Sequence, residues 1–223
     1  MKVNEIFTSI DGEVNNWGQG IMSTFIRLQG CNLKCSYCDT KYAQSTDQPY
    51  QSMSVKSIIE KIDSIGCKKI TITGGEPFLQ IEELQLLCRL LLIYNFNISI
   101  ETNGSINIPA WAKTSDNISL VIDYKLEFAD KMEINNFNML CDRYWIKFII
   151  GSDNDFYRAL SIIDSFKRQG FFISGKPKIA FSPIFGKVEP KELVELIKIN
   201  KKWDITLNLQ LHKFIWEPQK RGV

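Results

Sequence analysis

The chain has 223 residues, 44% of them apolar, which suffices for one full-sized hydrophobic core and would leave two domains cramped. Its 27 basic and 25 acidic residues are spread through the chain, so no electrostatic footprint for nucleic acid stands out. The amino terminus lacks the apolar core of a signal peptide, and polar residues interrupt each apolar run too soon for a bilayer span. We therefore expect a cytoplasmic protein that binds neither nucleic acid nor membrane.

The first element that the pattern indicates is a strand over 22–28, after a polar, glycine-containing loop at 15–20. Its residues alternate and include β-branched side chains, which is typical of a strand. Arg27 lies inside this strand and needs a partner. Two interpretations stay open: a surface arginine on the polar face of an edge strand, or a guanidinium that binds an anion in a functional site.

Three cysteines with CxxxCxxC spacing follow this strand: Cys31, Cys35 and Cys38. A reducing compartment disfavours disulfides, so the clustered three are better explained as metal ligands. A cubane iron–sulfur cluster is normally closed by four cysteines, and three would leave one iron open to a small molecule. The alternative is a zinc site, which needs a fourth protein ligand. The candidates for that ligand are Cys67, Cys88, Cys141 and the only histidine, His212.

The middle of the chain predicts helices and strands in alternation. A helix is expected over 54–65, with a serine N-cap at its start and Gly66 at its end. A buried strand over 69–73 leads into the motif GGEP at 74–77. The two glycines of this motif let backbone approach a ligand, and its proline suits the start of a helix. A strongly apolar helix follows over 81–94.

Later apolar runs also end in polar groups, which predicts several strands whose ends share one rim. These runs lie at 97–104, 119–125, 144–151 and 205–212, with helices expected over 155–169 and 190–201. Parallel strands of α/β enzymes carry their chemistry at the carboxyl ends. About six strands and fewer helices than strands predict an α/β fold, a trimmed, open (β/α) barrel. The aromatic tail after 212 is too patterned for a frayed terminus, and a strand docked on the sheet edge is its simplest structural explanation.

Together these motifs resemble the radical S-adenosylmethionine (SAM) superfamily and, within it, the 7-carboxy-7-deazaguanine synthase family. The resemblance covers nearly the full length. Its motifs are IDGE at 10–13, FIRL at 25–28, the cysteine loop with CDT at 38–40, TGGEP at 73–77, ETNG at 101–104, QLHK at 210–213 and KRGV at 220–223. The resemblance implies a single radical SAM domain over 1–223, with an N-terminal substrate loop at 8–20 and a C-terminal tail at 212–223.

The reaction implied by this resemblance is a radical ring contraction. It would convert 6-carboxy-5,6,7,8-tetrahydropterin to 7-carboxy-7-deazaguanine and release ammonia, a lyase step of queuosine and 7-deazapurine biosynthesis. A reduced [4Fe-4S] cluster would cleave SAM to a 5′-deoxyadenosyl radical, so no side chain is expected to be catalytic itself. The resemblance also implies Mg²⁺, a flavodoxin- or ferredoxin-type electron donor and a homodimer.

Residue roles follow from the matched positions. Cys31, Cys35 and Cys38 would hold the cluster, and Thr40 would hold Mg²⁺. The implied cofactor-binding residues are Tyr37, Cys38, Asp39, Gly74, Gly75, Glu76, Asn103, Asp123, Tyr124, Lys125, Ser182, Pro183, Ile184 and Phe185. The implied substrate-binding residues are Ile10, Asp11, Gly12, Glu13, Arg27, Thr73 and Val223. For Thr40 the alternative is a hydroxyl that satisfies the backbone of its own loop.

The chain departs from the family pattern at three positions. Asp11 stands where many members have glutamine, and Val14 and Glu217 stand where glycine is common. Asp11 matters most, because an acid and an amide present different hydrogen-bond sets to a pterin edge.

Two other functions stay open on sequence alone. A glycyl-radical activase shares the cluster spacing but acts on a large protein, and the Gly12-Glu13 motif and the tail at 212–223 argue against it. A non-catalytic metal-binding module that contacts nucleic acid is the second, and the balanced charge argues against that.

Overall fold

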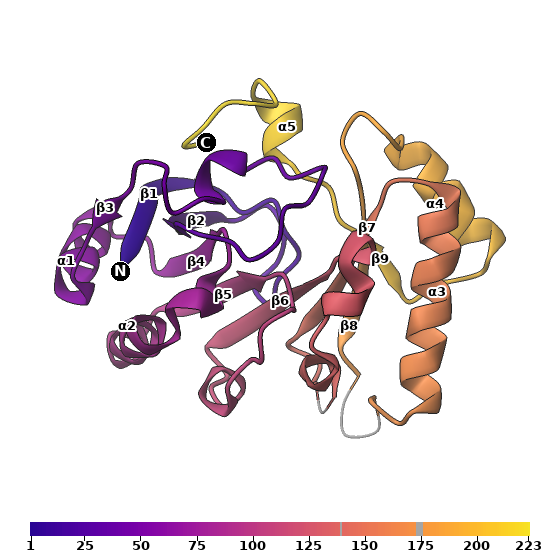
Figure 1. Ribbon diagram of the computed structural model, residues 1–223, viewed down its shortest axis with the longest axis horizontal. Coiled ribbons are helices and arrows are strands. Elements are labelled where there is room, and N and C mark those ends of the chain that lie inside the picture. Colours follow the sequence, from indigo (N-terminus) through magenta and orange to yellow (C-terminus); the bar gives the residue numbers. More distant parts are fainter. Residues whose placement is uncertain (139, 173–175) are drawn as a thin grey trace.

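The strands of the described chain, residues 1–138, 140–172 and 176–223 of a computed structural model, form one nine-stranded sheet (Figure 1). Its strand order is β3-β1-β2-β4-β5-β6-β7-β8-β9. From β2 to β9 neighbouring strands are parallel, whereas β1 and β3 add antiparallel at one edge. The strands are β1 (Lys2–Ile10), β2 (Met22–Leu28), β3 (Gln51–Ser52), β4 (Lys69–Gly74), β5 (Asn97–Thr102), β6 (Ile118–Tyr124), β7 (Trp145–Ile150), β8 (Lys178–Pro183) and β9 (Ile205–Leu207).

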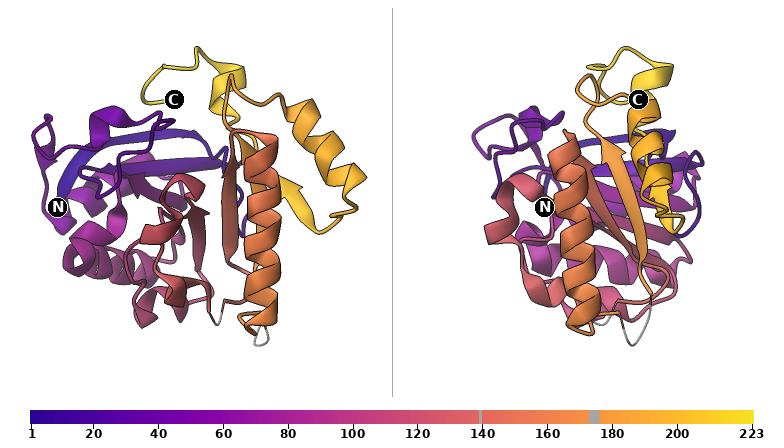
Figure 2. Two further views of the ribbon diagram at one scale, coloured as in Figure 1. Left: turned by 45° about the vertical axis from the view of Figure 1, so that its right-hand side comes forward. Right: turned by 90° about the vertical axis from the view of Figure 1, so that its right-hand side faces the viewer.

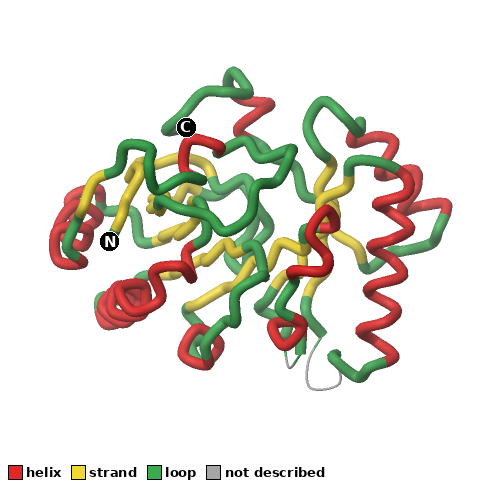
Figure 3. The backbone as a smooth tube through the Cα atoms, viewed as in Figure 1, coloured by secondary structure: helices red, strands yellow, loops and turns green. Residues whose placement is uncertain are grey.

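The sheet curves without closing, and the longer helices lie on its outer face (Figure 3). The α-helices of the described chain are α1 (Val55–Ile65), α2 (Ile81–Ile93), α3 (Asp153–Arg168), α4 (Pro190–Ile199) and the short α5 (His212–Ile215). Short 3₁₀ helices are η1 (Lys41–Ala43), η2 (Pro77–Gln80), η3 (Ala110–Lys113), η4 (Leu126–Lys131) and η5 (Ile134–Phe137). Helices are fewer than strands if only the α-helices are counted, so the predicted trimmed, open barrel is confirmed. No helix within the described ranges is long and apolar enough to cross a membrane.

Local signals place the first long helix where the sequence predicts it. The Ser54 hydroxyl accepts a hydrogen bond from the Ser57 amide at 3.1 Å, which satisfies one free donor at the start of α1. Gly66 ends the helix with a φ of 79°, a left-handed conformation that glycine adopts without steric cost. The apolar face of α1, with Ile58 and Ile62, is fully buried in the core.

The strand count and the last strand differ from expectation. Strands β1, β3 and β8 were not predicted, because β1 is only partly buried, β3 has two residues and β8 ends in a proline. The run at 205–212 was expected to be one strand, but β9 ends at Leu207. The chain leaves the sheet there because the buried Asn208 side chain bonds to loop and strand groups, and residues from His212 form α5 instead of continuing the sheet. The tail is therefore not an edge strand.

The tail lies above the carboxyl ends of the parallel strands, between the two halves of the curved sheet (Figure 2). The loop after β1 fills the interior of the barrel from the opposite side. Ile10 pairs with Met22 at the amino end of β2. Further along this loop, Val14 packs against the inward-facing Val121, Trp145 and Ala180. An open barrel is thus filled by its own N-terminal loop.

The backbone of β4 passes very close to the exit of β2. The Gly75 amide donates to the Leu28 carbonyl at 3.0 Å, and the Glu76 amide donates to the Gly30 carbonyl at 2.8 Å. A Cβ atom on Gly75 would lie 1.9 Å from the Gly30 carbonyl oxygen. Glycine is required here for a close backbone approach, as the GGEP motif predicts.

Replacing Gly75 by alanine is expected to destabilise the fold strongly. The obstacle is backbone, which no rotamer change relieves, so we expect a loss of about 3 kcal/mol or more, roughly 6–12 °C in melting temperature. Gly151→Ala is the matched control, because the nearest atom to its new Cβ is the end of the flexible Ile184 side chain. Thermal unfolding followed by circular dichroism checks both variants. Equal melting temperatures for the two would contradict the steric explanation.

Candidate functional site

A cavity of about 850 Å³ opens at the carboxyl ends of the parallel strands. Its walls come from the cysteine loop, the N-terminal loop, the strand ends and the C-terminal tail. It brings together every residue predicted to bind the cluster, SAM, Mg²⁺ or substrate, with the exceptions of Glu76 and Tyr124. Residues almost the whole chain apart, such as Ile10 and Val223, line the same space.

Glu76 and Tyr124 shape the walls from behind. The buried Glu76 carboxylate accepts hydrogen bonds from the Asn103 amide at 2.7 Å, the Phe78 amide at 3.0 Å and the Thr102 hydroxyl at 2.8 Å. Burial raises the pKa of Glu76 to about 7. This carboxyl group joins the ends of β4 and β5. Tyr124 stacks on Phe148 in the core, with ring centroids 5.1 Å apart.

The cysteine loop presents three free thiols to the cavity. Cys31 accepts weak hydrogen bonds from the Leu33 amide and the Asn103 side chain, and the Cys38 sulfur lies 3.5 Å from the Thr40 hydroxyl. Burial raises the pKa of Cys35 to about 11, so metal binding must displace a proton from this thiol. These thiolate donors suit an iron–sulfur cluster.

The three thiols all line the cavity. In the ranges that the structure describes, no three Cys, His, Asp or Glu side chains form a group that could hold one metal ion. A cubane places its protein ligands on different irons, so it does not need such convergence. Of the residues considered as a fourth zinc ligand, His212 lines the cavity, whereas Cys67, Cys88 and Cys141 are not among its lining residues.

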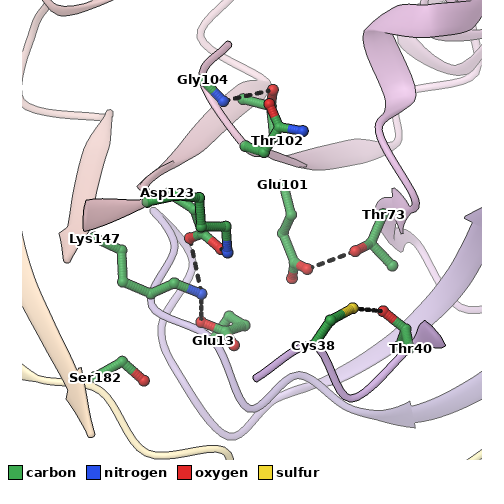
Figure 4. A network of polar contacts seen from close by, with 12 residues as sticks. Glu13, Cys38, Thr40, Thr73, Glu101, Thr102, Gly104, Asp123, Lys147 and Ser182 are labelled. Atoms are coloured by element: carbon green, nitrogen blue, oxygen red, sulfur yellow. Dashed lines mark hydrogen bonds and ion pairs between the residues drawn. The ribbon is translucent and has the colours of Figure 1, made fainter. Parts of the chain in front are cut away.

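Four charged side chains that line the cavity alternate in sign, and three of them, Glu13, Lys147 and Asp123, are labelled in Figure 4. We call them the ion-pair chain; its members are Glu13, Lys147, Asp123 and Lys125. Lys147 pairs with the Glu13 carboxylate and, at 2.9 Å, with Asp123. Lys125 pairs with the other oxygen of Asp123 at 2.7 Å. Burial alone would lower the pKa of Lys147, but Asp123 and Glu13 raise it, so the ammonium group stays charged.

Asn208 also holds Glu13. Its side-chain amide donates to the Glu13 carboxylate at 2.9 Å and to the Ser182 hydroxyl at 3.2 Å, and its oxygen accepts from the Val14 amide at 2.7 Å. Asn208 is fully buried. It therefore fixes both the backbone and the carboxylate of the N-terminal loop.

Asp11 lines the cavity, but both oxygens of its carboxylate bond to other groups of the protein. One oxygen accepts from Lys69, from the Thr71 hydroxyl at 2.8 Å and from the Asn15 side chain at 3.3 Å. The other oxygen accepts from the Glu13 amide at 3.0 Å. The side chain that replaces the common glutamine is thus an anchor of the N-terminal loop.

Arg27 points into the cavity from β2, which lies between β1 and β4. The interpretation as a surface arginine on an edge strand is wrong. Its Nε donates to the Glu5 carboxylate at 2.8 Å, and Glu5 also accepts from the Tyr42 hydroxyl at 3.0 Å. The guanidinium of Arg221 lies over the Tyr42 ring, 3.7 Å from its centroid. Pairing through Nε holds the guanidinium of Arg27 by one edge.

The tail is tied to the cysteine loop through Asp39. Its carboxylate accepts from the Gln210 side chain at 2.7 Å and pairs with Lys213 at 3.0 Å. Burial alone would raise the pKa of Asp39, but Lys213 outweighs it and holds the pKa below its usual value.

Among the residues of this site that were not predicted, Glu5, Glu101, Lys147 and Asn208 hold or carry its charges. Glu101 lines the cavity, where the Thr73 hydroxyl donates to one carboxylate oxygen at 2.7 Å. Its other oxygen is buried and has no hydrogen-bond partner among the described residues. A charged residue inside an apolar strand pattern, as Lys147 is at 145–150, was the one available signal, because such a residue needs a buried partner.

Comparison with known proteins agrees with this geometry. The Radical SAM superfamily matches residues 25–199. A 7-carboxy-7-deazaguanine synthase of Clostridium acetobutylicum is 42% identical over 225 residues, covering 100% of this chain and 99% of the relative. One of Chlorobaculum tepidum is 33% identical, covering 100% and 97%. The crystal structure of QueE from Escherichia coli has the same fold, with a TM-score of 0.73 at 24% identity over 94% of this chain and 93% of that one. The chain belongs to the radical SAM superfamily and, within it, to the 7-carboxy-7-deazaguanine synthase family.

Proposed function

We propose that this enzyme converts 6-carboxy-5,6,7,8-tetrahydropterin to 7-carboxy-7-deazaguanine and releases ammonia. One observation carries the proposal: a single cavity joins three free thiols to buried carboxylates and an arginine. Relatives of the same length carry the name of this activity. Neither a glycyl-radical activase nor a non-catalytic module has comparable support.

The family implies a [4Fe-4S] cluster and SAM, and the donor set of the cavity fits both. We assign Cys31, Cys35 and Cys38 to the cluster. When bound, the cluster and SAM supply a 5′-deoxyadenosyl radical. The protein binds and orients SAM and the substrate and excludes water from them. On this assignment the strand ends at Asn103, Asp123 and 182–185 lie along SAM.

The pterin is assigned to the side of the cavity formed by the N-terminal loop. Arg27 is suited to the substrate carboxylate, because Glu5 holds its Nε and the two terminal nitrogens can form a bidentate pair. Glu13 and Thr73 present acceptor and hydroxyl groups to the ring, and Val223 contributes from the tail. Asp11 acts here through the conformation of the loop.

Thr40 is assigned to Mg²⁺. Its hydroxyl makes no cap hydrogen bond to η1, which weakens the alternative of a purely local role. A hydroxyl oxygen beside several waters is a suitable partner for this ion. We further assign the whole chain to a single domain and propose a cytoplasmic homodimer that receives electrons from a flavodoxin- or ferredoxin-type donor.

Anaerobically reconstituted enzyme with dithionite, SAM, Mg²⁺ and the carboxytetrahydropterin is expected to form 7-carboxy-7-deazaguanine, detected by mass spectrometry. Cys35→Ala should form neither this product nor 5′-deoxyadenosine, because one cluster ligand is lost. Release of 5′-deoxyadenosine by the unaltered enzyme without the deazaguanine would keep the family chemistry and refute the substrate.

Thr40→Ala is expected to leave the cluster intact and to weaken Mg²⁺ binding. The activity should then need a roughly 10–100-fold higher Mg²⁺ concentration, the range typical for loss of a group that supports a metal site. Iron content and the visible spectrum check the cluster, and Thr40→Ser should keep the normal dependence. Unchanged Mg²⁺ dependence in Thr40→Ala would rule out the assignment.

Glu101 should make the stability of the protein depend on pH. Burial and the charges of Glu13 and Asp11 raise its pKa to about 8. Between an ordinary carboxyl pKa and this value, the folded protein keeps a proton that the unfolded chain releases, so stability falls as pH rises. Glu101→Gln removes the effect and should melt several degrees higher than the unaltered protein at pH 8.5 but not at pH 5.

The control is Glu60→Gln, an acid-to-amide change on the exposed face of α1. Its melting curve should follow that of the unaltered protein at every pH. The explanation fails if Glu101→Gln and the unaltered protein show parallel melting temperatures from pH 5 to 8.5.

A further inference from the structure

Lys147 is the only member of the ion-pair chain that touches both of its carboxylates. Lys147 pairs with Glu13 on the N-terminal loop and with Asp123 at the end of β6. Its side chain is 5% exposed, so both contacts lie in a poorly solvated place. Coulomb interactions between such groups are stronger and less screened by salt than at the surface.

Glu13 and Lys125, the two end members of the ion-pair chain, face different parts of the cavity. Glu13 is one of the residues assigned to the pterin, and Asn208 holds its carboxylate. Lys125 lies at the cysteine loop, with its ammonium 5.9 Å from the centre of the Tyr37 ring. The charges of Asp123, Tyr37 and Cys35 raise the pKa of Lys125 above its usual range despite its burial.

We propose that Lys147 is a positioning residue that makes the binding of substrate and of SAM mutually reinforcing. This inference rests on the proposed function, because that function supplies the two ligands. Lys147 acts through its neighbours: it holds Glu13 on one side and Asp123 on the other.

The sign of the coupling follows from the alternation of charge. Hydrogen-bond donors on the pterin would share the Glu13 carboxylate and so weaken its hold on Lys147. Lys147 can then neutralise more of Asp123, which loosens the pairing between Asp123 and Lys125. The freed Lys125 ammonium can in turn attract an anionic group at the cysteine loop, such as the carboxylate of SAM.

Linkage makes the effect reciprocal, because a ligand that changes the affinity of another site must be affected by the same factor. Another carboxyl group faces the ion-pair chain, since Glu101 also raises the pKa of Lys147. The neutral Asn208 side chain holds Glu13 without touching Asp123. Replacing Asn208 therefore distinguishes the holding of Glu13 from the connection between Glu13 and Asp123. Losing it loosens Glu13 but leaves the connection to Asp123 in place.

The test measures SAM affinity of the cluster-loaded enzyme by anaerobic equilibrium dialysis, with and without saturating carboxytetrahydropterin. We expect the pterin to tighten SAM binding at least about fivefold in the unaltered enzyme, the lower end of typical coupling. In Lys147→Met this factor should fall to near one. Lys147→Arg, which keeps a cation between the two carboxylates, should restore most of it.

Asn208→Ala is the matched control, with weaker pterin binding but an unchanged coupling factor. If Lys147→Met does not fold or load its cluster, Glu13→Gln is tested in its place. This change removes the negative charge that Lys147 pairs with and should also abolish the coupling. Coupling that survives in Lys147→Met or Glu13→Gln, or that Asn208→Ala removes equally, overturns the inference. If the proposed substrate itself is wrong, the unaltered enzyme will neither bind nor convert the pterin, which distinguishes that outcome from a failure of the inference.

Discussion

Buried carboxylates beneath the cavity are the constraint on which the rest of the site depends. An open barrel needs something to fill its interior, and here the filling is a polar N-terminal loop with Asp11 and Glu13. A carboxylate removed from water is costly unless it is paired and hydrogen-bonded. Lys69 from β4 and Lys147 from β7 provide this pairing. The N-terminal loop and the two lysines therefore stabilise each other: the carboxylates of the loop need the lysines, and the buried lysines need the carboxylates.

The C-terminal segment completes what the unclosed sheet leaves open. Asn208 binds the N-terminal loop, and Gln210 and Lys213 bind Asp39 on the cysteine loop. A stretch of six residues thereby joins the two loops that carry the assigned substrate and cluster ligands. Because β9 stops at Leu207, these side chains are free to reach sideways across the rim. The early end of the last strand is thus what allows one segment to bridge both loops.

Local physical signals let the sequence predict most of the architecture. Ser54 and Gly66 mark the ends of α1 because a cap and a left-handed glycine act within a few residues. The GGEP motif indicates a close backbone approach for the same reason, and the cysteine spacing needs no tertiary information. The site residues that were found carry recognisable motifs.

Pairings between distant residues could not be read from the sequence. Glu5 meets Arg27 because β1 and β2 are antiparallel with these residues in register, and β1 itself gives a weak pattern. Lys147 meets Glu13 across 134 positions, and Asn208 meets it across 195. The end of β9 was mistaken because an alternating run continued past the point where Asn208 turned inward. Register and loop placement decide such contacts, and local propensity carries no information about either.

The charged groups at the cavity differ in how completely the protein pairs them. Asp11 and Glu76 have both carboxylate oxygens bonded to protein donors. Within the described chain, Glu101 keeps one buried oxygen without a partner, and Arg27 is held by protein through Nε. Leaving a buried polar atom unpaired costs free energy that a ligand can return on binding. We infer that the paired charges fix the geometry of the cavity, and that Glu101, Arg27 and the three free thiols are the groups left available to a ligand.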